Sequence, residues 1–580
     1  MKRTIRRRPF DLDGERKLPA DLHPVLRRVY AARSVRAADE LDCSARRLAP
    51  PTAMTGLDDA AGLLQRALRE DWRVLIVGDF DADGATSTAL AIRALAAMGA
   101  AHVDYLVPNR FDFGYGLSPA LVEVAAERRP DLIVTVDNGI SSLEGVAAAR
   151  SRGIRVLVTD HHLPGPVLPE ADVIVNPNLR GDPFPSKHLA GVGVIFYVMA
   201  ALRQRLRDDG HFAAAGIPEP AMAELLDLVA VGTVADVVTL DHNNRILVEQ
   251  GLRRIRAGRA CPGILALLEV SGREPAWAVA SDLGFAVGPR LNAAGRLEDM
   301  SIGIECLLAA SGADARSTAE TLDRLNRQRR DIETQMREEA LAALERAEAV
   351  LEGEELPRGL CLYDAGWHPG VVGILAARVK ERYHRPVVAF APEDGGRLKG
   401  SARSVPGVHV RDALEAVNSR FPDLIEKFGG HAMAAGLTLT ANALEPFRTA
   451  FDRVVAEMTG DRKPEGVLLS DGELAAGEIS LWMAELLQSA GPWGQGFPEP
   501  LFDGVFGVVD CRIVGERHLK MRLRHPSGDG AIDAIAFNQG EHRYAVGQGA
   551  VRMAYRLDVN EYRGRRSAQL VVEYLEPAEP

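Results

Sequence analysis

The sequence predicts an α/β protein that starts with a doubly wound parallel sheet and continues into smaller domains. From about residue 47 to 240, short β-branched runs alternate with Ala- and Leu-rich stretches of helical spacing. The runs are apolar throughout rather than at alternate positions, which is typical of parallel strands covered on both faces. Acidic residues recur at or near the ends of these runs, and open parallel sheets bind their ligands at that edge.

The individual elements follow from the same patterns. The expected strands are VLIV (74–77), VDYLV (103–107), LIVTV (132–136), VLVT (156–159) and VIV (173–175). Between them lie STALAIRALAAMG, SPALVEVAAERR and SSLEGVAAARSRG, whose apolar spacing suits crossover helices. Residues 190–310 are expected to be mostly helical, with a break at GPRLNAAGRL (288–297).

The second half of the chain predicts a long connecting helix, a second α/β unit and a barrel. Good helix formers and i,i+4 opposite charges favour a solvated helix over 314–352. The strands GLCLYD and PVVAF, the helix GVVGILAARVKERY and Gly-rich turns at 395–407 and 429–436 indicate the α/β unit. We therefore expect five segments: an N-terminal extension (1–46), the first α/β domain with its helical part (47–313), the connecting helix (314–352), a second α/β domain (353–462) and a C-terminal domain (463–580).

The C-terminal segment has five or six alternating runs separated by turn residues, which predicts a small antiparallel barrel of OB type. Between residues 510 and 566 there are eleven Arg and Lys against seven Asp and Glu, although the whole chain carries a net charge of −11. Such a local reversal suits a surface that follows phosphates, and a solvated β surface is the alternative. Candidate stacking platforms are Phe497, Phe502, Tyr555 and Tyr562, unless they form the barrel core.

Composition bounds the class of protein. With 47% apolar and 26% charged residues, the chain resembles an ordinary globular protein. It has no run of about 18 apolar residues that could span a membrane. The basic start MKRTIRRRPF precedes no apolar signal core, so we expect a cytoplasmic location. A solvated tail is the favoured interpretation of this start, and contact with nucleic acid is the alternative.

Cysteine usage constrains the metal chemistry. The five cysteines are scattered and show no CxxC spacing, which argues against a disulfide framework and a structural zinc site. Any metal would then be held by carboxylate oxygen and imidazole nitrogen. Such ligands favour manganese or magnesium.

A cluster of acids and histidines predicts where that metal binds. Asp79, Asp81 and Asp83 follow the first strand at alternate positions, so an extended segment would direct all three to one face. Two divalent ions about 4 Å apart can hold a hydroxide and brace a phosphoryl oxygen. The predicted ligands of such a pair are Asp79, Asp81, Asp83, Asp137, His161 and Asp236. Each alone has an ordinary explanation as a helix cap or a loop residue. Their recurrence at successive strand ends, with Asp236 near the end of the apolar run LVAVGTVADVV, favours a metal site.

These motifs resemble a known superfamily. The DHH phosphoesterases have four motifs, and similar phrases occur here in the same order: GDFDADG, TVDNGIS, TDHH and GTVADVV. Further phrases, including GPRLNAAGRL, GSARSVPGVHV and KFGGHAMAAGL, resemble the bacterial exonucleases of this superfamily that degrade single-stranded DNA from the 5′ end. The resemblance covers about residues 45 to 575. One departure is Asp112-Phe113, where many relatives have Glu-Asp.

The resemblance implies a DHH domain, a DHHA1 domain and an OB domain, with Mn²⁺ or Mg²⁺ bound in a two-metal site. It implies a catalytic set of His162 facing the scissile phosphate, Asp160 supporting the imidazoles and Asp79 on the metals. It also implies that Arg110, Arg290, Ser401 and Arg403 bind the 5′ end and that His431 lies in a substrate-binding loop. Asn292 and Arg296 are further candidates for nucleic-acid contact, with salt bridges inside the helical region as the alternative.

The implied activity is a 5′→3′ exonuclease that releases 5′-mononucleotides from single-stranded DNA in recombination, mismatch repair and DNA repair. It would be a monomer and work with single-strand-binding protein and a helicase. Three alternatives compete: a phosphodiesterase for short oligoribonucleotides or cyclic dinucleotides, a non-catalytic DNA-binding scaffold, and a family II pyrophosphatase. The C-terminal segment argues against the first, the complete set of carboxylates against the second, and Asp79 in place of histidine against the third.

Overall fold

The computed structural model describes residues 3–108, 116–350, 357–460, 466–515, 517–528, 530–540, 549–562 and 564–578. The chain divides into two compact units. One comprises Arg7–Leu325 and Leu469–Pro580, and the other comprises Met1–Arg6 and Asn326–Leu468.

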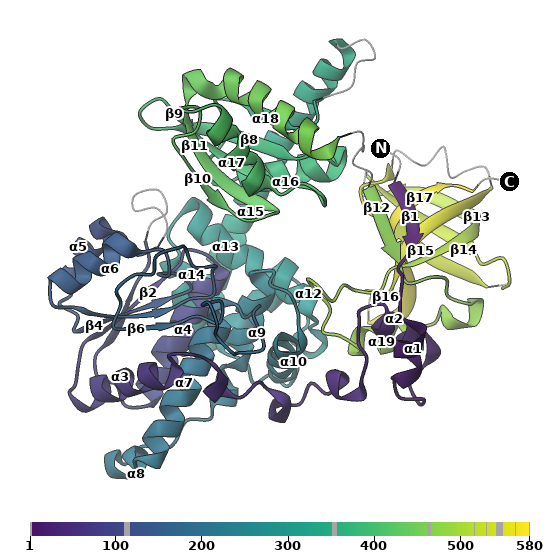
Figure 1. Ribbon diagram of the computed structural model, residues 1–580. Coiled ribbons are helices and arrows are strands. Elements are labelled where there is room, and N and C mark those ends of the chain that lie inside the picture. The colour runs from purple at the N-terminus through teal and green to yellow at the C-terminus, as the bar shows by residue number, and fades with distance from the viewer. Residues whose placement is uncertain are drawn as a thin grey trace. The chain divides into compact units, whose positions relative to one another are not determined.

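The first unit contains the predicted parallel sheet (Figure 1). Its strands are β2 (Val74–Gly78), β3 (Val103–Leu106), β4 (Leu132–Val136), β5 (Arg155–Thr159) and β6 (Val173–Val175). They lie in the order β3-β2-β4-β5-β6, and all pairs are parallel. The chain places β3 on one side of β2 and β4 on the other, so the winding reverses between β2 and β4. Ligands of doubly wound sheets bind at the carboxyl edge of that point.

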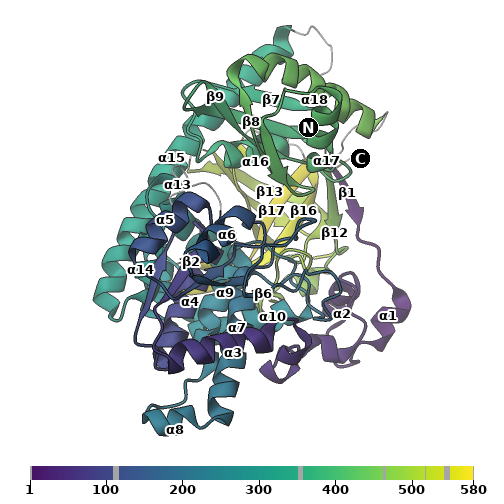
Figure 2. The same cartoon turned by 60° about the vertical axis from the view of Figure 1, so that its left-hand side comes forward.

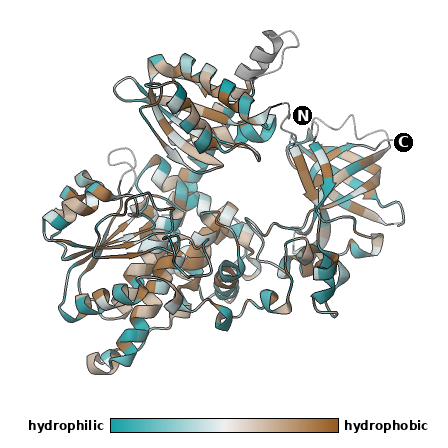
Figure 3. Cartoon of the chain, in the orientation of Figure 1, coloured by the Kyte–Doolittle hydropathy of each residue, from teal (hydrophilic) through white to brown (hydrophobic). Residues whose placement is uncertain are grey.

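Helices cover both faces of this sheet, which explains why its strands are apolar at every position. Ile76 and Val134 face the core with α3 (Leu57–Arg69), α4 (Ala82–Ala97) and α7 (Gly191–Asp208). Val77 and Ile133 face α5 (Pro119–Glu127) and α6 (Leu143–Ser151). Hydropathy colouring shows the apolar strands between these helices (Figure 3).

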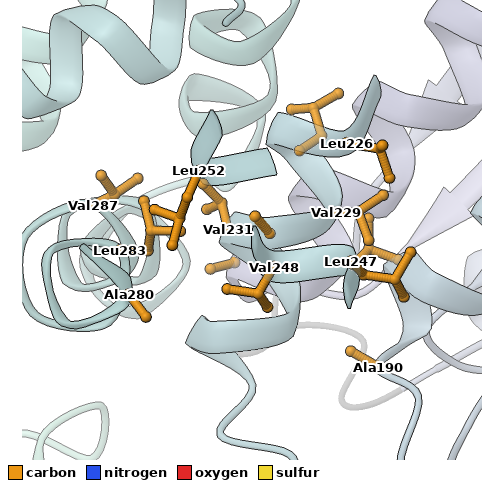
Figure 4. Close-up of a cluster of buried hydrophobic side chains, with 14 of the residues drawn as sticks. Ala190, Leu226, Val229, Val231, Leu247, Val248, Leu252, Ala280, Leu283 and Val287 are labelled. Carbon is orange, nitrogen blue, oxygen red and sulfur yellow. The ribbon is translucent and has the colours of Figure 1, made fainter. Parts of the chain in front are cut away.

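The helical part of the unit corrects two expectations. LVAVGTVADVV forms helix α9 (Leu226–Ala235) rather than a strand, and GPRLNAAGRL forms helix α13 (Gly288–Leu297) rather than a break. Helix α9 packs against α10 (His242–Arg256) and the π-helical turn Leu283–Val287, so apolar side chains surround it (Figure 4). A helix buried on all sides has no amphipathic period, and its sequence then resembles a buried strand. The other helices are α1 (Leu12–Lys17), α2 (Pro24–Ala31), α8 (His211–Ala215), α11 (Pro262–Val270), α12 (Ala280–Asp282) and α14 (Ser301–Leu308).

The same unit contains the predicted OB-type barrel. Its strands are β13 (Phe502–Val514), β14 (His518–Arg524), β15 (Ala531–Ala536), β16 (Ala550–Tyr562) and β17 (Arg565–Pro577). They close in the order β13-β14-β15-β17-β16, and helix α19 (Leu481–Ser489) bonds to β16 through Gln488 and Asp558. Phe497, Phe502 and Tyr555 are at most 3% exposed, so these three are core residues and not stacking platforms. The side chain of Tyr562 lies outside the described residues.

The expectation of a solvated N-terminal tail was wrong. Strand β1 (Arg3–Arg7) pairs with β12 (Gly466–Ser470), and Ile5 is buried. Further along the extension, the buried guanidinium of Arg33 binds both carboxylate oxygens of Asp471, at 2.9 and 3.0 Å. The N-terminal segment is therefore folded: Arg3–Arg7 form a strand, and Arg33 pairs with a residue far along the chain.

The second unit is the predicted α/β domain. Its sheet has the order β10-β11-β9-β8-β7, in which only β7 and β8 are parallel. One face packs against α17 (Val410–Arg420) and α18 (Leu444–Thr459). The other packs against α16 (Val372–Tyr383) and residues 332–341 of α15 (Gly312–Val350) (Figure 2). The strands are β7 (Leu360–Tyr363), β8 (Val387–Glu393), β9 (Arg397–Arg403), β10 (Lys427–Gly430) and β11 (Ala434–Thr440).

The Gly-rich segments predicted as turns are therefore largely strands. Gly400 shows that a glycine can be required inside a strand by close packing, because a Cβ at this position would lie 2.5 Å from the Phe390 ring. Across the described residues, no helix is both long and apolar enough to cross a membrane.

Candidate metal centre

The acidic loop after β2 is not extended, which corrects the geometry expected for its carboxylates. Asp81 is the N-cap of α4, and its Oδ1 accepts hydrogen bonds from the backbone N–H groups of Asp83 (2.9 Å) and Gly84 (3.0 Å). Asp83 therefore lies in the first turn of the helix. The capping preference of aspartate outweighs the strand alternation here. The carboxylates still converge, because the helix turns back over Asp79.

The N-terminus of α7 holds the carboxylate of Asp83. Its oxygens accept hydrogen bonds from the N–H groups of Gly191 (2.6 Å) and Val192 (2.9 Å), where the helix dipole favours negative charge. Glycine is required at position 191 because the backbone of α7 passes close to Asp137, and a Cβ there would lie 2.5 Å from the Cβ of Asp137. Sequence reasoning missed this contact, and the only signal for it was the spacing of small residues in AGVGV.

Asp137 lies at the end of β4, in a left-handed backbone conformation with φ of 63°. Asn138 donates hydrogen bonds to the carbonyl oxygens of Val77 (3.0 Å) and Val136 (2.9 Å) and so ties the ends of β2 and β4 together. Gly139 follows with φ of 111°, which turns the chain away from the sheet. The sharp turn positions Asp137 at the point where the winding reverses.

Asp160 orients the two histidines. Its Oδ1 accepts hydrogen bonds from the backbone N–H groups of His161 and His162 and lies 2.7 Å from His162 Nδ1. Its Oδ2 accepts a hydrogen bond from the backbone N–H of Ile140. His161 Nε2 points elsewhere, at 3.1 Å from Asp137 Oδ1 and 3.6 Å from Asp236 Oδ2. Asp236 caps the C-terminal end of α9, so it reaches the cluster from a helix and not from a strand end.

All six predicted ligands meet in one place. Three groups have ligand atoms within 4.8 Å of one another: Asp79, Asp81 and Asp137; Asp83, His161 and Asp236; and Asp137, His161 and His162. These donors are carboxylate oxygens and imidazole nitrogens, which suit Mn²⁺ or Mg²⁺. Asp137 and His161 each belong to two of the groups. Of these two, only the carboxylate of Asp137 has two oxygens with which it could bridge two ions.

The negative charge of the buried carboxylates also favours the binding of cations. Burial, followed by the neighbouring carboxylates, raises the pKa of Asp83 to about 7 and the pKa values of Asp137 and Asp236 well above their usual range. Burial alone would lower the pKa of His162. The hydrogen bond to Asp160, together with the negative charges of Asp160, Asp236 and Asp79, raises this pKa to about 9. Without a cation, the folded protein must therefore keep protons in this cluster.

Metal binding should therefore depend on pH. Because these carboxyl pKa values are raised, the metal-free folded state keeps protons that the unfolded state has lost. These groups therefore lower the free energy of unfolding of the metal-free protein as pH rises from about 4 through about 7. A divalent cation displaces the same protons. We expect Mn²⁺ affinity to increase, and protons to be released on binding, as pH rises from about 6 to about 8. Titration calorimetry in buffers of different ionisation enthalpy measures the affinity and the number of protons released. An Mn²⁺ affinity that stays constant over this pH range would show that the metal does not displace protons from these carboxylates.

The residues predicted to contact nucleic acid on α13 are largely engaged within the protein. Arg290 is buried and donates to Asp323 from Nε (3.0 Å) and Nη2 (2.7 Å). Asn292 accepts a hydrogen bond from the N–H of Ala82 in the acidic loop. Arg296 is half-buried in the last turn of the helix. Arg110 lies outside the described residues, as do Asp112 and Phe113.

The remaining predicted residues belong to the second unit. Ser401 and Arg403 are both on β9, and Arg403 Nη1 donates to Ser401 Oγ at 2.9 Å. A Cβ at Gly373, in the first turn of α16, would lie 2.8 Å from Arg403 Nη2 and 3.0 Å from Ser401 Oγ. His431 is exposed at the turn between β10 and β11.

The segments match known domain families. Residues 73–233 match the DHH family N-terminal domain, residues 357–457 the DHHA1 domain and residues 470–574 the RecJ OB domain. Together with the clustered carboxylates and histidines, they define the class as a DHH-type phosphoesterase.

Individual relatives make the assignment more specific. The chain is 55% identical to the single-stranded-DNA-specific exonuclease RecJ of Salmonella typhimurium over 99% of both chains, and 53% identical to that of Escherichia coli over 100% of both. It is similar to the crystal structure of RecJ in complex with Mn²⁺ from Thermus thermophilus, with a TM-score of 0.81 and 31% identity over 100% of this chain and 80% of that one. The chain therefore belongs to the RecJ family of single-stranded-DNA-specific exonucleases.

Proposed function

We propose that this protein is a metal-dependent exonuclease that degrades single-stranded DNA in the 5′→3′ direction to 5′-mononucleotides. One observation carries the proposal: six carboxylate and imidazole ligands from four separate parts of the sequence meet where the winding of the sheet reverses. In this proposal Asp79, Asp81, Asp83, Asp137, His161 and Asp236 hold two Mn²⁺ or Mg²⁺ ions. The DHH domain (47–313) performs the chemistry, and residues 353–462 and 463–580 bind the DNA.

The chain's own residues have distinct roles in the hydrolysis. Divalent ions supply Lewis acidity toward a phosphate oxygen and lower the pKa of water. Asp160 fixes the ring of His162 through Nδ1, so Nε2 remains to donate a hydrogen bond to the scissile phosphate. The carboxylate of Asp160 also favours the protonated imidazole needed for that donation. Asp79 lies with Asp81 and Asp137 on the β2 side of the cluster and completes the catalytic set.

The second unit contains an anion site that suits the 5′-terminal phosphate. Burial lowers the pKa of Arg403, and no carboxylate within the described residues lies at ion-pair distance from it. Ser401 lies beside this guanidinium, and helix α16 starts nearby without a side-chain cap. A half-buried arginine, a hydroxyl and a helix N-terminus together favour a phosphate group. His431 and the arginines Arg110, Arg290 and Arg296 are proposed as further contacts to the 5′ end.

The barrel has an outer surface that suits the binding of the DNA strand. On β14, Leu519, Met521 and Leu523 point into the core, so His518, Lys520, Arg522 and Arg524 share the outer face. The ring of Phe537, which is 51% exposed, contacts His518 with a centroid separation of 5.3 Å. Basic side chains beside an exposed aromatic ring suit phosphates and stacked bases, so Phe537 replaces the buried aromatics as candidate platform.

The cellular setting belongs to the same proposal. We place the protein in the cytoplasm as a monomer that acts on DNA in recombination, mismatch repair and DNA repair. Single-strand-binding protein and a helicase would supply its substrate.

Digestion of matched DNA substrates tests the proposal. We expect Mn²⁺-dependent release of 5′-mononucleotides from a long 5′-phosphorylated strand, slower digestion of a 5′-hydroxyl strand and no digestion of a hairpin-blocked end. Arg403→Lys should reduce the preference for the 5′-phosphate by about 10- to 100-fold, because lysine cannot reproduce the arginine fork. Arg397→Lys on the same strand is the control, since Arg397 pairs with Glu426. Rapid turnover of dinucleotides but not of long strands would favour a small phosphodiesterase instead.

A further inference from the structure

Helix α13 supplies the missing partner for the first turn of α4. The first N–H groups of a helix have no intrahelical acceptor. Asp81 Oδ1 accepts from two of them, those of Asp83 and Gly84. The N–H of Ala82 donates instead to Asn292 Oδ1, at 2.8 Å. A residue far along the chain thus completes the cap of the acidic loop.

A second contact presses the same helix face against the loop. Gly295 follows Asn292 by three positions, so both lie on one side of α13. A Cβ at Gly295 would overlap the carbonyl oxygen of Phe80. The backbone between Asp79 and Asp83 is therefore in direct contact with α13 at two points.

Helix α13 is itself fixed to neighbouring elements. Arg290 joins it to Asp323 in the first part of α15 and donates from Nη1 to the carbonyl oxygen of Ala286 at 2.7 Å. At its start, a Cβ at Gly288 would lie 3.1 Å from the Cβ of Ala235, the residue before Asp236. The helix thus contacts both the loop that carries Asp81 and Asp83 and the end of α9 that carries Asp236.

We infer that α13 is a clamp that sets the separation between these two sets of carboxylates and that Asn292 is its positioning residue. The inference rests on the proposed metal-dependent function and assigns Asn292 to the metal loop rather than to DNA. Without the Asn292 oxygen, the N–H of Ala82 loses its acceptor, and we expect it to donate to a carboxylate of the same loop instead. It would then compete with the cations for the same lone pairs.

Two substitutions separate this role from a contact to DNA. Asn292→Leu keeps the number and branching of the side-chain heavy atoms and removes the acceptor, and we expect the Mn²⁺ affinity to fall about 10- to 100-fold. Asn292→Asp retains an acceptor oxygen and should restore most of that affinity. Electron paramagnetic resonance of unbound Mn²⁺ measures the affinity without reference to turnover. Raising the Mn²⁺ concentration should restore kcat of the leucine variant, while its KM for DNA stays unchanged.

Asn243→Leu is the matched control. Asn243 also accepts a backbone hydrogen bond, from the N–H of Ala49 at 2.9 Å, but on α10 and away from the acidic loop. It should lower the melting temperature and leave Mn²⁺ affinity intact. If Asn292→Leu does not fold, Asn292→Ala serves in its place.

The outcomes distinguish the clamp from the proposed function. If the unaltered protein binds no Mn²⁺, the proposed function fails. The clamp fails separately if the unaltered protein binds Mn²⁺ and Asn292→Leu binds it equally well, or if KM for DNA rises at unchanged Mn²⁺ affinity. Equal weakness of Asn292→Asp and Asn292→Leu would also overturn it.

Discussion

Replacing Asp137 with asparagine is expected to reduce both Mn²⁺ affinity and kcat by at least about 100-fold. Asp137 is shared by two of the three ligand groups, and an amide offers one neutral oxygen where a carboxylate offers two charged ones. Loss of a supporting residue around a metal already costs about 10- to 100-fold, so loss of a shared ligand should exceed that. Calorimetry with Mn²⁺ and single-turnover digestion of 5′-phosphorylated DNA measure the two effects.

Asp131→Asn provides the control for this change. Asp131 lies just before the other end of β4, where its carboxylate accepts a hydrogen bond from the N–H of Arg73 at 2.8 Å. It is expected to affect stability slightly and metal binding not at all. Equal activity of Asp137→Asn and the unaltered protein at limiting Mn²⁺ would contradict the two-metal assignment.

Gly191→Ala should damage the centre without removing any ligand. The added methyl group would lie 2.5 Å from the Cβ of Asp137 and 2.6 Å from its Oδ1, so either α7 or the end of β4 must shift. Such overpacking costs about 1–3 kcal/mol, and the shift would also weaken the hydrogen bonds from Gly191 and Val192 to Asp83. We expect a lower melting temperature together with Mn²⁺ affinity reduced by at least about tenfold.

The matched change is Gly312→Ala at the start of α15, where a Cβ would have no neighbour within 4 Å. This control should keep both stability and metal affinity. If Gly191→Ala also leaves both unchanged, α7 does not hold Asp83 and Asp137 in place.

The sequence was sufficient to predict the sheet and the convergence of the six candidate ligands because both depend on local patterns. Strands covered on both faces are apolar at every position, and the residues after β2, β4 and β5 must meet at one edge once the strands are parallel. Asp236 joins the cluster in a different way than expected. Its apolar run is a helix, but that helix also ends at the cluster.

Contacts between distant segments could not be predicted in this way. Asn292 was assigned to DNA, since nothing in GPRLNAAGRL indicates that its amide would meet the N–H of Ala82. The basic residues of β1 gave no sign of pairing with β12, because the register of distant strands depends on tertiary packing. Phe502 and Tyr555 show the same limit, since an alternating strand does not reveal which face of a closed barrel is inside.

The most direct test is anomalous diffraction from crystals soaked in Mn²⁺ and collected at the manganese absorption edge. We expect two peaks about 4 Å apart at the carboxyl edge of β2 and β4, with every protein ligand among the six predicted residues. A single peak elsewhere on the protein, or no peak beside Asp137 at saturating Mn²⁺, would contradict it.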